Sequence, residues 1–360
     1  MESWKDYLSF SVESKINFAN PMNHQQLMFR CLHLAQFGQG MVAPNPMVGS
    51  LLLYGDKIIG EGWHRAFGEA HAEVNAINDV TEPFLLAAST LYVNLEPCSH
   101  HGKTPPCTDF IISKGIKKVV IGMIDPFAAV NGNGVRLLRE AGIDVTVNVL
   151  EAECRELNKR FITYQTEKRP YIILKWAQSA DGYIGRSGKR VHISNPLSRV
   201  LTHQLRSTSS AILVGTNTVL ADDPQLNVRH WFGKNPLRVS IDKEKRIPAR
   251  AKILDGSQET LLFTFEENAL LPNVEYEKLD PSNSIPEQII KSLYKRNIRC
   301  VLIEGGTFTI ESFLSIGMWD EAFVFHSPQL LLNGVKAPEL NLFSFKEEQI
   351  GDNRLQIFKR

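Results

Sequence analysis

The sequence has little net charge, few cysteines and no long apolar run. Its 40 Lys and Arg residues nearly balance its 39 Asp and Glu residues, which leaves a formal net charge of +1. This balance argues against a protein held on nucleic acid by a general basic field, although a local basic patch would be compatible with it. The apolar runs at residues 51–53 and 119–121 have the length of buried strands, so we expect no membrane partner.

The number of cysteines argues against a protein held together by disulfides. An odd number of cysteines suits a reducing compartment with metal thiolates better than a disulfide framework, so we expect a cytoplasmic protein. Cys31, Cys154 and Cys300 lie in apolar or helical contexts and are predicted to be packing residues. Residues 1–22 lack the continuous apolar segment of a secretory signal, and we treat them as an N-terminal extension.

The predicted elements of the first half indicate an α/β domain. A helix begins at Asn23, which forms a capping-box pattern with Gln26, and it ends at Gly38 or Gly40. Strands over residues 48–53, 57–62, 90–94, 118–123 and 144–149 then alternate with helices over 70–79, 108–114 and 135–141.

A second α/β domain follows, since 360 residues exceed one average domain. The charged helical segment 151–169 ends at Arg169-Pro170, where we place the boundary between domains 23–168 and 169–360. The second domain is predicted to contain strands over residues 171–176, 211–215, 237–242, 259–265, 300–303 and 322–326, with helices over 196–207, 285–296 and 308–314.

One group of residues points to metal chemistry. His71 and Glu73 lie at the start of the predicted helix 70–79, Cys98 follows the strand 90–94, and Cys107 precedes the helix 108–114. An imidazole and two thiols are three ligands for a tetrahedral zinc ion, whose fourth position is left for water. The Glu73 carboxylate is then placed to move that water's proton, as in zinc deaminases that replace a ring amino group with oxygen.

The alternative is a purely structural zinc site. Such a site needs a fourth protein ligand, which His100 or His101 could supply. The open, catalytic site is favoured because Glu73 shares a predicted helical turn with His71 and because a proline directly precedes Cys98.

The segment PCSHHGKTPPC at residues 97–107 is longer than the Cys-x-x-Cys motif of cytidine deaminases. It resembles the deaminase domain of the bifunctional riboflavin-biosynthesis deaminase–reductase family, as do NPMVG at 45–49 and GEGWH at 60–64. The resemblance implies an N-terminal cytidine-deaminase-like three-layer α/β/α domain with one zinc ion. It further implies deaminase substrate contacts from Asn45, His64, Lys103, Thr104 and Asp125.

In this resemblance, Asn45 and His64 hold a pyrimidine, and Lys103 with Thr104 meets its ribose phosphate. A lysine ammonium is a suitable point charge for a phosphate. Phe127 departs from the family, which usually has an asparagine at this position. The nearby NGNG at residues 131–134 lacks the third glycine of a dinucleotide fingerprint, so we expect no cofactor there.

The second half resembles the reductase domain of the same family, a relative of dihydrofolate reductase. The resemblance lies in LKWAQSADG at residues 174–182, VGTNTVLADDP at 214–224 and EGGT at 304–307. Small residues between a strand and a helix let backbone N–H groups approach a phosphate. The implied fold is a C-terminal dihydrofolate-reductase-like α/β domain.

Position by position, the resemblance implies an NADPH site and a site for a ribosylamino substrate. The implied NADPH contacts are Ala177, His192, Thr218, Asp222, Gly306 and Thr307. The implied substrate contacts are Lys175, Arg190, Arg206, Leu226, Arg229 and Glu304. Arg206 and Arg229 would bind phosphate because guanidinium groups can do so bidentately. Ala180 and His192 stand where the family usually has leucine and tryptophan.

The resemblance therefore implies a bifunctional enzyme of riboflavin biosynthesis. The first domain would deaminate 2,5-diamino-6-ribosylamino-4(3H)-pyrimidinone 5′-phosphate, and the second would reduce the product, 5-amino-6-(5-phosphoribosylamino)uracil, with NADPH. We expect small phosphorylated pyrimidines as partners and a homo-oligomer, either a dimer or a tetramer. The alternatives are a deaminase with an inactive reductase domain, a nucleic-acid-editing deaminase and a non-catalytic zinc-stabilised binding module.

Overall fold

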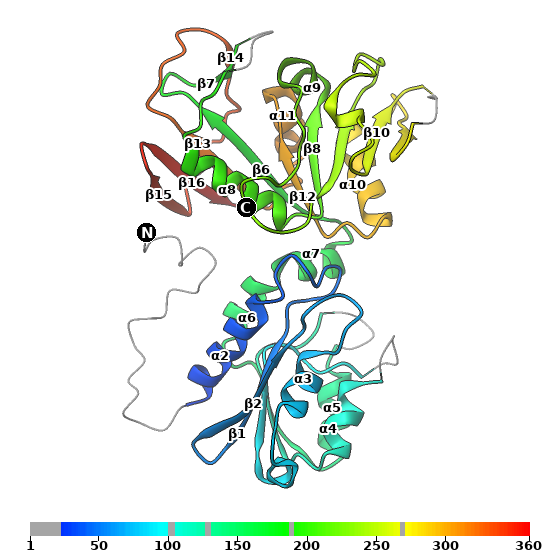
Figure 1. The fold of residues 1–360 in the computed structure, drawn as a ribbon, viewed down its shortest axis with the longest axis vertical. Coiled ribbons are helices and arrows are strands. Elements are labelled where there is room, and N and C mark those ends of the chain that lie inside the picture. Colours follow the sequence, from blue (N-terminus) through cyan, green and yellow to red (C-terminus); the bar gives the residue numbers. More distant parts are fainter. Residues whose placement is uncertain (1–22, 100–104, 127–130, 187–190, 267–270) are drawn as a thin grey trace. The chain divides into compact units, whose positions relative to one another are not determined.

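The computed structural model describes residues 23–99, 105–126, 131–186, 191–266 and 271–360. The chain divides into two compact units, residues 1–167 and 168–360 (Figure 1). The predicted extension 1–22 lies outside the described residues. Within the described residues, no helix is both long and apolar enough to span a bilayer.

The first unit is built on a five-stranded sheet with the order β2-β1-β3-β4-β5. The sheet is mixed, because β1 runs antiparallel to β2 and β3, whereas β3, β4 and β5 are parallel to one another. The strands are β1 (Gly49–Tyr54), β2 (Lys57–Trp63), β3 (Thr90–Val93), β4 (Lys118–Ile121) and β5 (Asp144–Thr146).

Alternating side chains of this sheet enter two separate cores, as the period of two in a strand requires. Leu51, Tyr92 and Val120 pack with α2 (His24–Gln36) and α6 (Glu151–Leu157). Their neighbours Leu52 and Leu91 pack on the opposite face with α3 (Ala72–Asn78), α4 (Cys107–Ser113) and α5 (Asn133–Glu140). The predicted three-layer α/β/α domain is confirmed.

The start of α2 also agrees with the sequence. Asn23 is the N-cap residue, its side chain accepts from the Gln26 N–H at 2.9 Å, and the Gln26 side chain accepts from the Asn23 N–H at 2.9 Å. Cys31 and Cys154 are fully buried in the core beside α2, and Cys300 is buried in the second unit, as predicted for packing residues.

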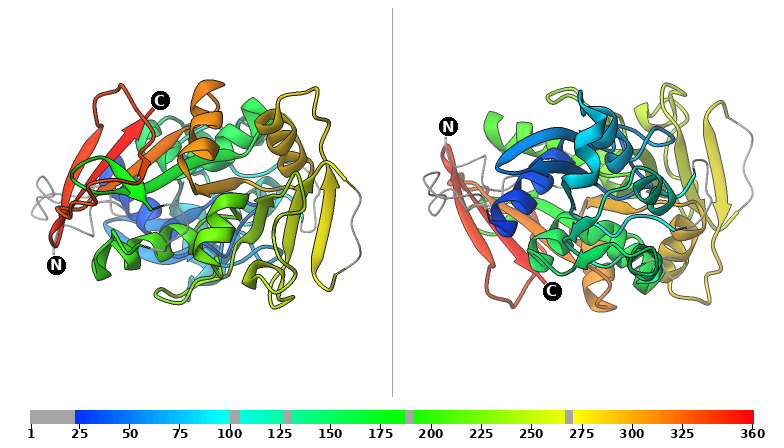
Figure 2. Two further views of the ribbon diagram at one scale, coloured as in Figure 1. Left: turned by 90° about the horizontal axis from the view of Figure 1, so that it is seen from above. Right: turned by 90° about the horizontal axis from the view of Figure 1, so that it is seen from below.

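The second unit is built on a nine-stranded sheet with the order β11-β10-β9-β8-β12-β6-β13-β16-β15. All pairs from β11 to β13 are parallel, and the β15–β16 hairpin is antiparallel. Figure 2 shows β15 and β16 in red at one edge and β11 in yellow at the other. The strands are β6 (Tyr171–Gln178), β8 (Ala211–Gly215), β9 (Leu237–Ile241), β10 (Thr260–Thr264), β11 (Val274–Lys278), β12 (Cys300–Glu304), β13 (Glu321–His326), β15 (Lys346–Ile350) and β16 (Asn353–Lys359).

Helices cover both faces of this sheet. The apolar sides of α10 (Ile285–Lys295) and α11 (Thr307–Ser315) pack against the largest core cluster, which includes Ile172, Val301 and Ala322 of the central strands. Helix α8 (Pro196–Ser207) lies on the other face (Figures 1 and 2). This layered α/β unit agrees with the predicted fold class.

Several elements differ from the predictions. The segment 151–169 forms two helices, α6 and α7 (Lys159–Glu167), and α5 begins at Asn133 after an N-cap glycine, Gly132, with φ 84°. The elements that were not predicted include the helix α9 (Thr216–Asp222), the short 3-10 helices η1 (Pro83–Ala88) and η2 (Lys252–Leu254), the pair β7 (Tyr183–Gly185) and β14 (Val335–Lys336), β11, and the hairpin of β15 and β16.

Two strand glycines let α3 lie very close to β2. A Cβ atom on Gly60 would lie 2.4 Å from the Ala76 carbonyl oxygen, and one on Gly62 would lie 2.3 Å from the Ala76 nitrogen. Both neighbours are backbone atoms, so no rotamer change can make room. Since His71 is the N-cap of α3 and Glu73 lies in its first turn, the two glycines determine where these side chains stand.

We therefore expect Gly62→Ala to destabilise the first unit by about 2 kcal/mol or more, because overpacking against backbone must displace α3. Scanning calorimetry of the whole chain would measure the loss. The matched control is Gly185→Ala, whose new Cβ atom would have no neighbour within 4 Å. Equal effects of the two substitutions would contradict the argument.

Candidate active sites

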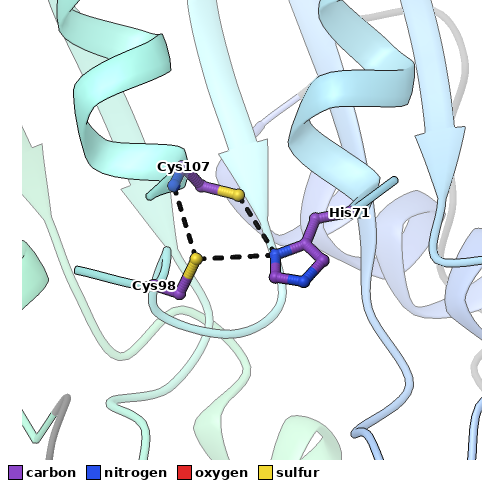
Figure 3. Close-up of side chains that lie close together, drawn as sticks. All are labelled: His71, Cys98 and Cys107. Carbon is purple, nitrogen blue, oxygen red and sulfur yellow. Dashed lines mark hydrogen bonds between the residues drawn. The ribbon is translucent and has the colours of Figure 1, made fainter. Parts of the chain in front are cut away.

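Three potential metal ligands converge in the first unit. His71 precedes α3, Cys98 lies in the loop after β3, and Cys107 is the first residue of α4 (Figure 3). The His71 Nδ1 atom lies 3.3 Å from Cys107 Sγ and 3.5 Å from Cys98 Sγ. All three ligand atoms lie within 4.8 Å of one another. His71 thus stands one residue before the helix rather than in its first turn as predicted.

The protons of these three side chains are distributed in a way that suits a bound cation. A hydrogen bond from Cys107, together with one from His71, lowers the pKa of Cys98 to about 4 despite burial. The hydrogen bond to Cys98 raises the pKa of His71 to about 9, and the same thiolate raises the pKa of Cys107. The Cys98 thiolate therefore accepts hydrogen bonds from two protonated side chains, His71 and Cys107. A divalent cation can replace these two protons.

This donor set fits zinc. Two sulfur atoms and one imidazole nitrogen are borderline-soft ligands, and three of them leave one position of a tetrahedron open. No fourth His, Cys, Asp or Glu joins the group among the described residues. His100 and His101, the ligands of the structural alternative, lie outside the described residues.

Glu73 is the acidic group beside these ligands. Its side chain is buried, and burial raises the pKa of its carboxyl, opposed by the nearby charge of His71. A carboxyl whose pKa is raised towards neutrality can both accept and return a proton, which suits general acid–base catalysis. The geometry therefore places a buried carboxyl beside three potential metal ligands.

Two of the predicted pyrimidine contacts adjoin the metal ligands. Asn45 Nδ2 and His64 Nε2 lie 3.0 Å apart, and the His64 ring packs edge-on against His71 with centroids 5.4 Å apart. Burial lowers the pKa of His64, which favours the neutral ring. Asp125 is buried in the loop after β4. The structure does not describe Lys103 and Thr104, nor the departure from the family at position 127.

The sequence analysis missed Glu96, which holds the loop of Cys98. This buried carboxylate accepts backbone hydrogen bonds from Asp125 at 3.1 Å, Gly132 at 2.9 Å and Val135 at 3.1 Å. It thereby ties the loop to the start of α5. An acidic residue directly before Pro-Cys was the available signal.

Two buried asparagines, also missed, hold the segment 45–49. Asn158 accepts from the Met47 N–H at 2.8 Å and donates to the Met47 carbonyl at 3.0 Å. Asn94 donates to the same carbonyl at 3.1 Å and accepts from the Gly49 N–H at 2.8 Å. These amides fix the backbone from which Asn45 projects.

The second unit contains a cavity of about 950 Å³ at the carboxyl ends of β6, β8, β9 and β12. Every predicted cofactor and substrate residue that the structure describes lines it; only Arg190 lies outside the described residues. These lining residues are Lys175, Ala177, His192, Arg206, Thr218, Asp222, Leu226, Arg229, Glu304, Gly306 and Thr307.

An ionic group forms one wall of this cavity. Arg206 donates from Nε and Nη2 to the two Glu304 carboxylate oxygens at 2.8 and 2.7 Å, and from Nη1 to the Asn227 carbonyl at 3.2 Å. Burial opposes ionisation of Glu304, but the charges of Arg206 and Lys175 lower its pKa to about 2. Burial also lowers the pKa of Lys175. Each of the three guanidinium nitrogens of Arg206 thus already donates a hydrogen bond within the protein.

The lining residues next to this ionic group in sequence suit a phosphorylated cofactor. Gly306 is the N-cap of α11, and its N–H donates to Thr218 Oγ1 at 3.0 Å, which joins the starts of α9 and α11. Five cations that also line the cavity were missed, namely Arg186, Arg199, Lys243, Arg246 and Lys252. Lys243 comes directly after the predicted strand 237–242, which was a usable signal.

Comparisons with known proteins match both units of the chain. Residues 21–123 match the cytidine and deoxycytidylate deaminase zinc-binding region, and residues 170–341 match the RibD C-terminal domain. The riboflavin biosynthesis protein RibD of Aquifex aeolicus is 40% identical over 91% of this chain and 96% of its own length. The chain belongs to the RibD family. The RibD protein of Escherichia coli is 36% identical over 86% of this chain and 89% of its own length.

A solved RibD-type structure has the same fold. The Thermotoga maritima diaminohydroxyphosphoribosylaminopyrimidine deaminase/5-amino-6-(5-phosphoribosylamino)uracil reductase is 38% identical and superposes with a TM-score of 0.85, covering 93% of this chain and 98% of its own. This chain is therefore a bifunctional enzyme of riboflavin biosynthesis, with a zinc-dependent deaminase and an NADPH-dependent reductase. The predictions of fold class, enzyme class and cofactors are confirmed, and both halves match, which disfavours the alternatives.

We expect Cys98→Ser to lose most of the bound zinc, because a ligand is removed from a site with three protein donors. Glu73→Gln should retain zinc, since Glu73 is not among the converging ligand atoms. Elemental analysis of the purified proteins measures both. Cys300→Ala, which changes a buried thiol of the second unit, is the control and should keep its zinc. Zinc loss in Glu73→Gln would contradict the assignment.

The Glu304 carboxylate should stabilise the second unit in a pH-dependent way. Its pKa is about 2 against an ordinary 4.5, so the stabilisation is complete above the ordinary pKa and disappears as the pH falls through the lowered one. Its size is on the order of 3 kcal/mol. The difference in unfolding free energy between wild type and Glu304→Gln should be constant from about pH 8 to about pH 5 and shrink in more acidic solution.

Denaturant unfolding at several pH values measures this difference. The control is Glu266→Gln, because the Glu266–Lys245 pair is exposed and should contribute little. A difference for Glu304→Gln that grows on acidification would overturn the electrostatic explanation.

Proposed function

We propose that the first site deaminates 2,5-diamino-6-ribosylamino-4(3H)-pyrimidinone 5′-phosphate and that the second reduces the resulting 5-amino-6-(5-phosphoribosylamino)uracil to the ribitylamino product. The observation that carries the proposal is the convergence of His71, Cys98 and Cys107 beside the buried carboxyl of Glu73. The cavity of the second unit, with its cationic lining, supports the second step.

In the first site, His71, Cys98 and Cys107 hold zinc. When bound, zinc supplies a Lewis acid that makes water acidic enough to act as a nucleophile near neutral pH. Glu73 takes the proton of the attacking water and returns it to the departing amino group, which leaves as ammonia.

Asn45, His64 and Asp125 orient the pyrimidine, and Lys103 with Thr104 binds the ribose phosphate. Asn45 and His64 form one side of the site, because the His64 ring packs against His71, one of the metal ligands. Hydrogen bonds from fixed side chains keep the reacting ring carbon within reach of the water.

In the second site, NADPH supplies the hydride. Ala177, His192, Thr218, Asp222, Gly306 and Thr307 hold the cofactor, and Lys243 and Arg246 suit its additional phosphate. Lys175, Arg190, Leu226 and Glu304 position the ribosyl carbon that receives the hydride. Arg229 and the remaining N–H groups of Arg206 bind the substrate phosphate.

We further propose that the deaminase domain spans residues 23–168 and the reductase domain residues 169–360. The near-zero net charge supports small phosphorylated pyrimidines as partners rather than nucleic acid. The odd number of cysteines, free among the described residues, supports a cytoplasmic enzyme. We also propose a homo-oligomer, a dimer or a tetramer.

The decisive experiment supplies the purified chain with the phosphorylated diaminopyrimidine, zinc and NADPH, and measures ammonia and NADPH together. We expect ammonia release followed by NADPH oxidation in a ratio of about one to one. Glu73→Gln should lose at least about 100-fold of the deamination rate because the proton carrier is absent. It should still oxidise NADPH when given the deaminated intermediate, which makes each site the control for the other.

Each alternative gives a different result. Ammonia without NADPH oxidation, also from added intermediate, would indicate an inactive reductase. Tight RNA binding that weakens steeply with salt would favour a nucleic-acid-editing deaminase. Unchanged turnover of Glu73→Gln would refute the role of Glu73.

A further inference from the structure

The loop between α9 and β9 carries two of the proposed reductase substrate residues. Leu226 is buried and has a left-handed backbone with φ 52°, while Arg229 is exposed at the cavity. Residues 224–229 belong to neither a helix nor a strand. Their position must therefore come from contacts outside regular secondary structure.

Helix α8 supplies two of these contacts, both to the loop backbone. Arg206 Nη1 donates to the Asn227 carbonyl at 3.2 Å. One helical turn earlier, His203 Nδ1 accepts the Arg229 backbone N–H at 3.1 Å. The His203 side chain is buried, with 3% exposure for the residue, and its ring packs edge-on against His230 with centroids 4.8 Å apart.

The protonation of His203 matches this role. Nδ1 can accept a hydrogen bond only when it carries no proton, so the ring must be neutral. Burial, followed by the charges of Arg206 and Arg229, lowers the pKa of His203 to about 3. The imidazole therefore remains an acceptor throughout the physiological pH range.

We infer that His203 is a positioning residue of the reductase: its imidazole anchors the backbone of Arg229 so that the guanidinium group meets the phosphate of the substrate. The inference rests on the proposed function, in which Arg229 binds that phosphate. Arg206 is buried and directs Nε, Nη1 and Nη2 to Glu304 and Asn227, whereas Arg229 is exposed at the cavity and donates from Nη1 to the Asn227 side chain at 2.9 Å, so Arg229 is the more accessible of the two for a phosphate.

The test compares His203→Leu with His203→Asn in the full chain. Leucine fills the buried space without an acceptor, whereas the asparagine amide oxygen can take the place of Nδ1. The reductase is assayed with NADPH, the deaminated phosphorylated substrate and its dephosphorylated counterpart. For His203→Leu we expect KM for the phosphorylated substrate to rise about tenfold, the effect of losing one hydrogen bond.

A purely structural role would give a different pattern. We expect His203→Leu to leave KM for NADPH and kcat/KM for the dephosphorylated substrate unchanged, and His203→Asn to restore most of the lost affinity. A parallel rise of KM for all three compounds, or no rise at all, would overturn the inference. Equal defects of the leucine and asparagine variants would overturn it as well.

Arg229→Ala separates this inference from the proposed function. If Arg229→Ala leaves KM for the phosphorylated substrate unchanged, the proposed phosphate role of Arg229 fails. If Arg229→Ala raises KM and His203→Leu does not, only the positioning role of His203 fails. With both roles present, the double variant should be no worse than Arg229→Ala alone, since the two residues act in series.

Discussion

The metal site of the first unit depends on one buried carboxylate, that of Glu96. The loop with Cys98 has no regular secondary structure, and Glu96 binds three backbone N–H groups that would otherwise be buried without a partner. Gly134 belongs to the same contact, because a Cβ atom there would lie 2.4 Å from the Pro97 carbonyl oxygen. Helix α5 can therefore lie directly on the loop, and the first cysteine ligand is held without belonging to a helix or strand.

In the second unit, charged side chains hold the elements around the cavity in place. Lys175, Arg206 and Glu304 come from β6, α8 and β12, and the attraction of both cations to the Glu304 carboxylate offsets part of the cost of burying the three groups. This group fixes the spacing between a helix on one face and the strand ends below it. The cavity thus has a rigid ionic wall against which a substrate can be placed.

Much of the fold could be predicted because local signals and tertiary packing agree. The helix Pro196–Ser207 and the strand Ala211–Gly215 have the predicted bounds, since Asn195 caps the former and the latter is a short, fully buried apolar run that includes the β-branched Ile212 and Val214. The hairpin of β15 and β16 was missed because β15 is a polar strand at the sheet edge, where alternate side chains face water and the apolar signal is weak.

Only part of the residues of the two sites could be predicted from the sequence. Ligand types, the acidic residue beside them and the resemblance of the motifs led to residues that the structure brings together, three potential metal ligands in the first unit and the lining of the cavity in the second. Residues that act through others, such as Glu96, Asn94, Asn158 and His203, carry no motif. Their roles arise from hydrogen bonds to backbone groups far away in sequence, as in the bond of Asn158 to Met47, and only the fold brings these together.

The positions of the three ligands link metal supply to the amount of folded enzyme. His71 and Cys107 begin two different helices and Cys98 belongs to the loop between them, so an ion bound there cross-links segments that are separate in the unfolded chain. A ligand that binds only the folded state adds about 4 kcal/mol of stability when its free concentration is 1,000 times its dissociation constant. Zinc starvation would then lower the amount of folded protein as well as the deaminase activity of each chain that lacks the ion.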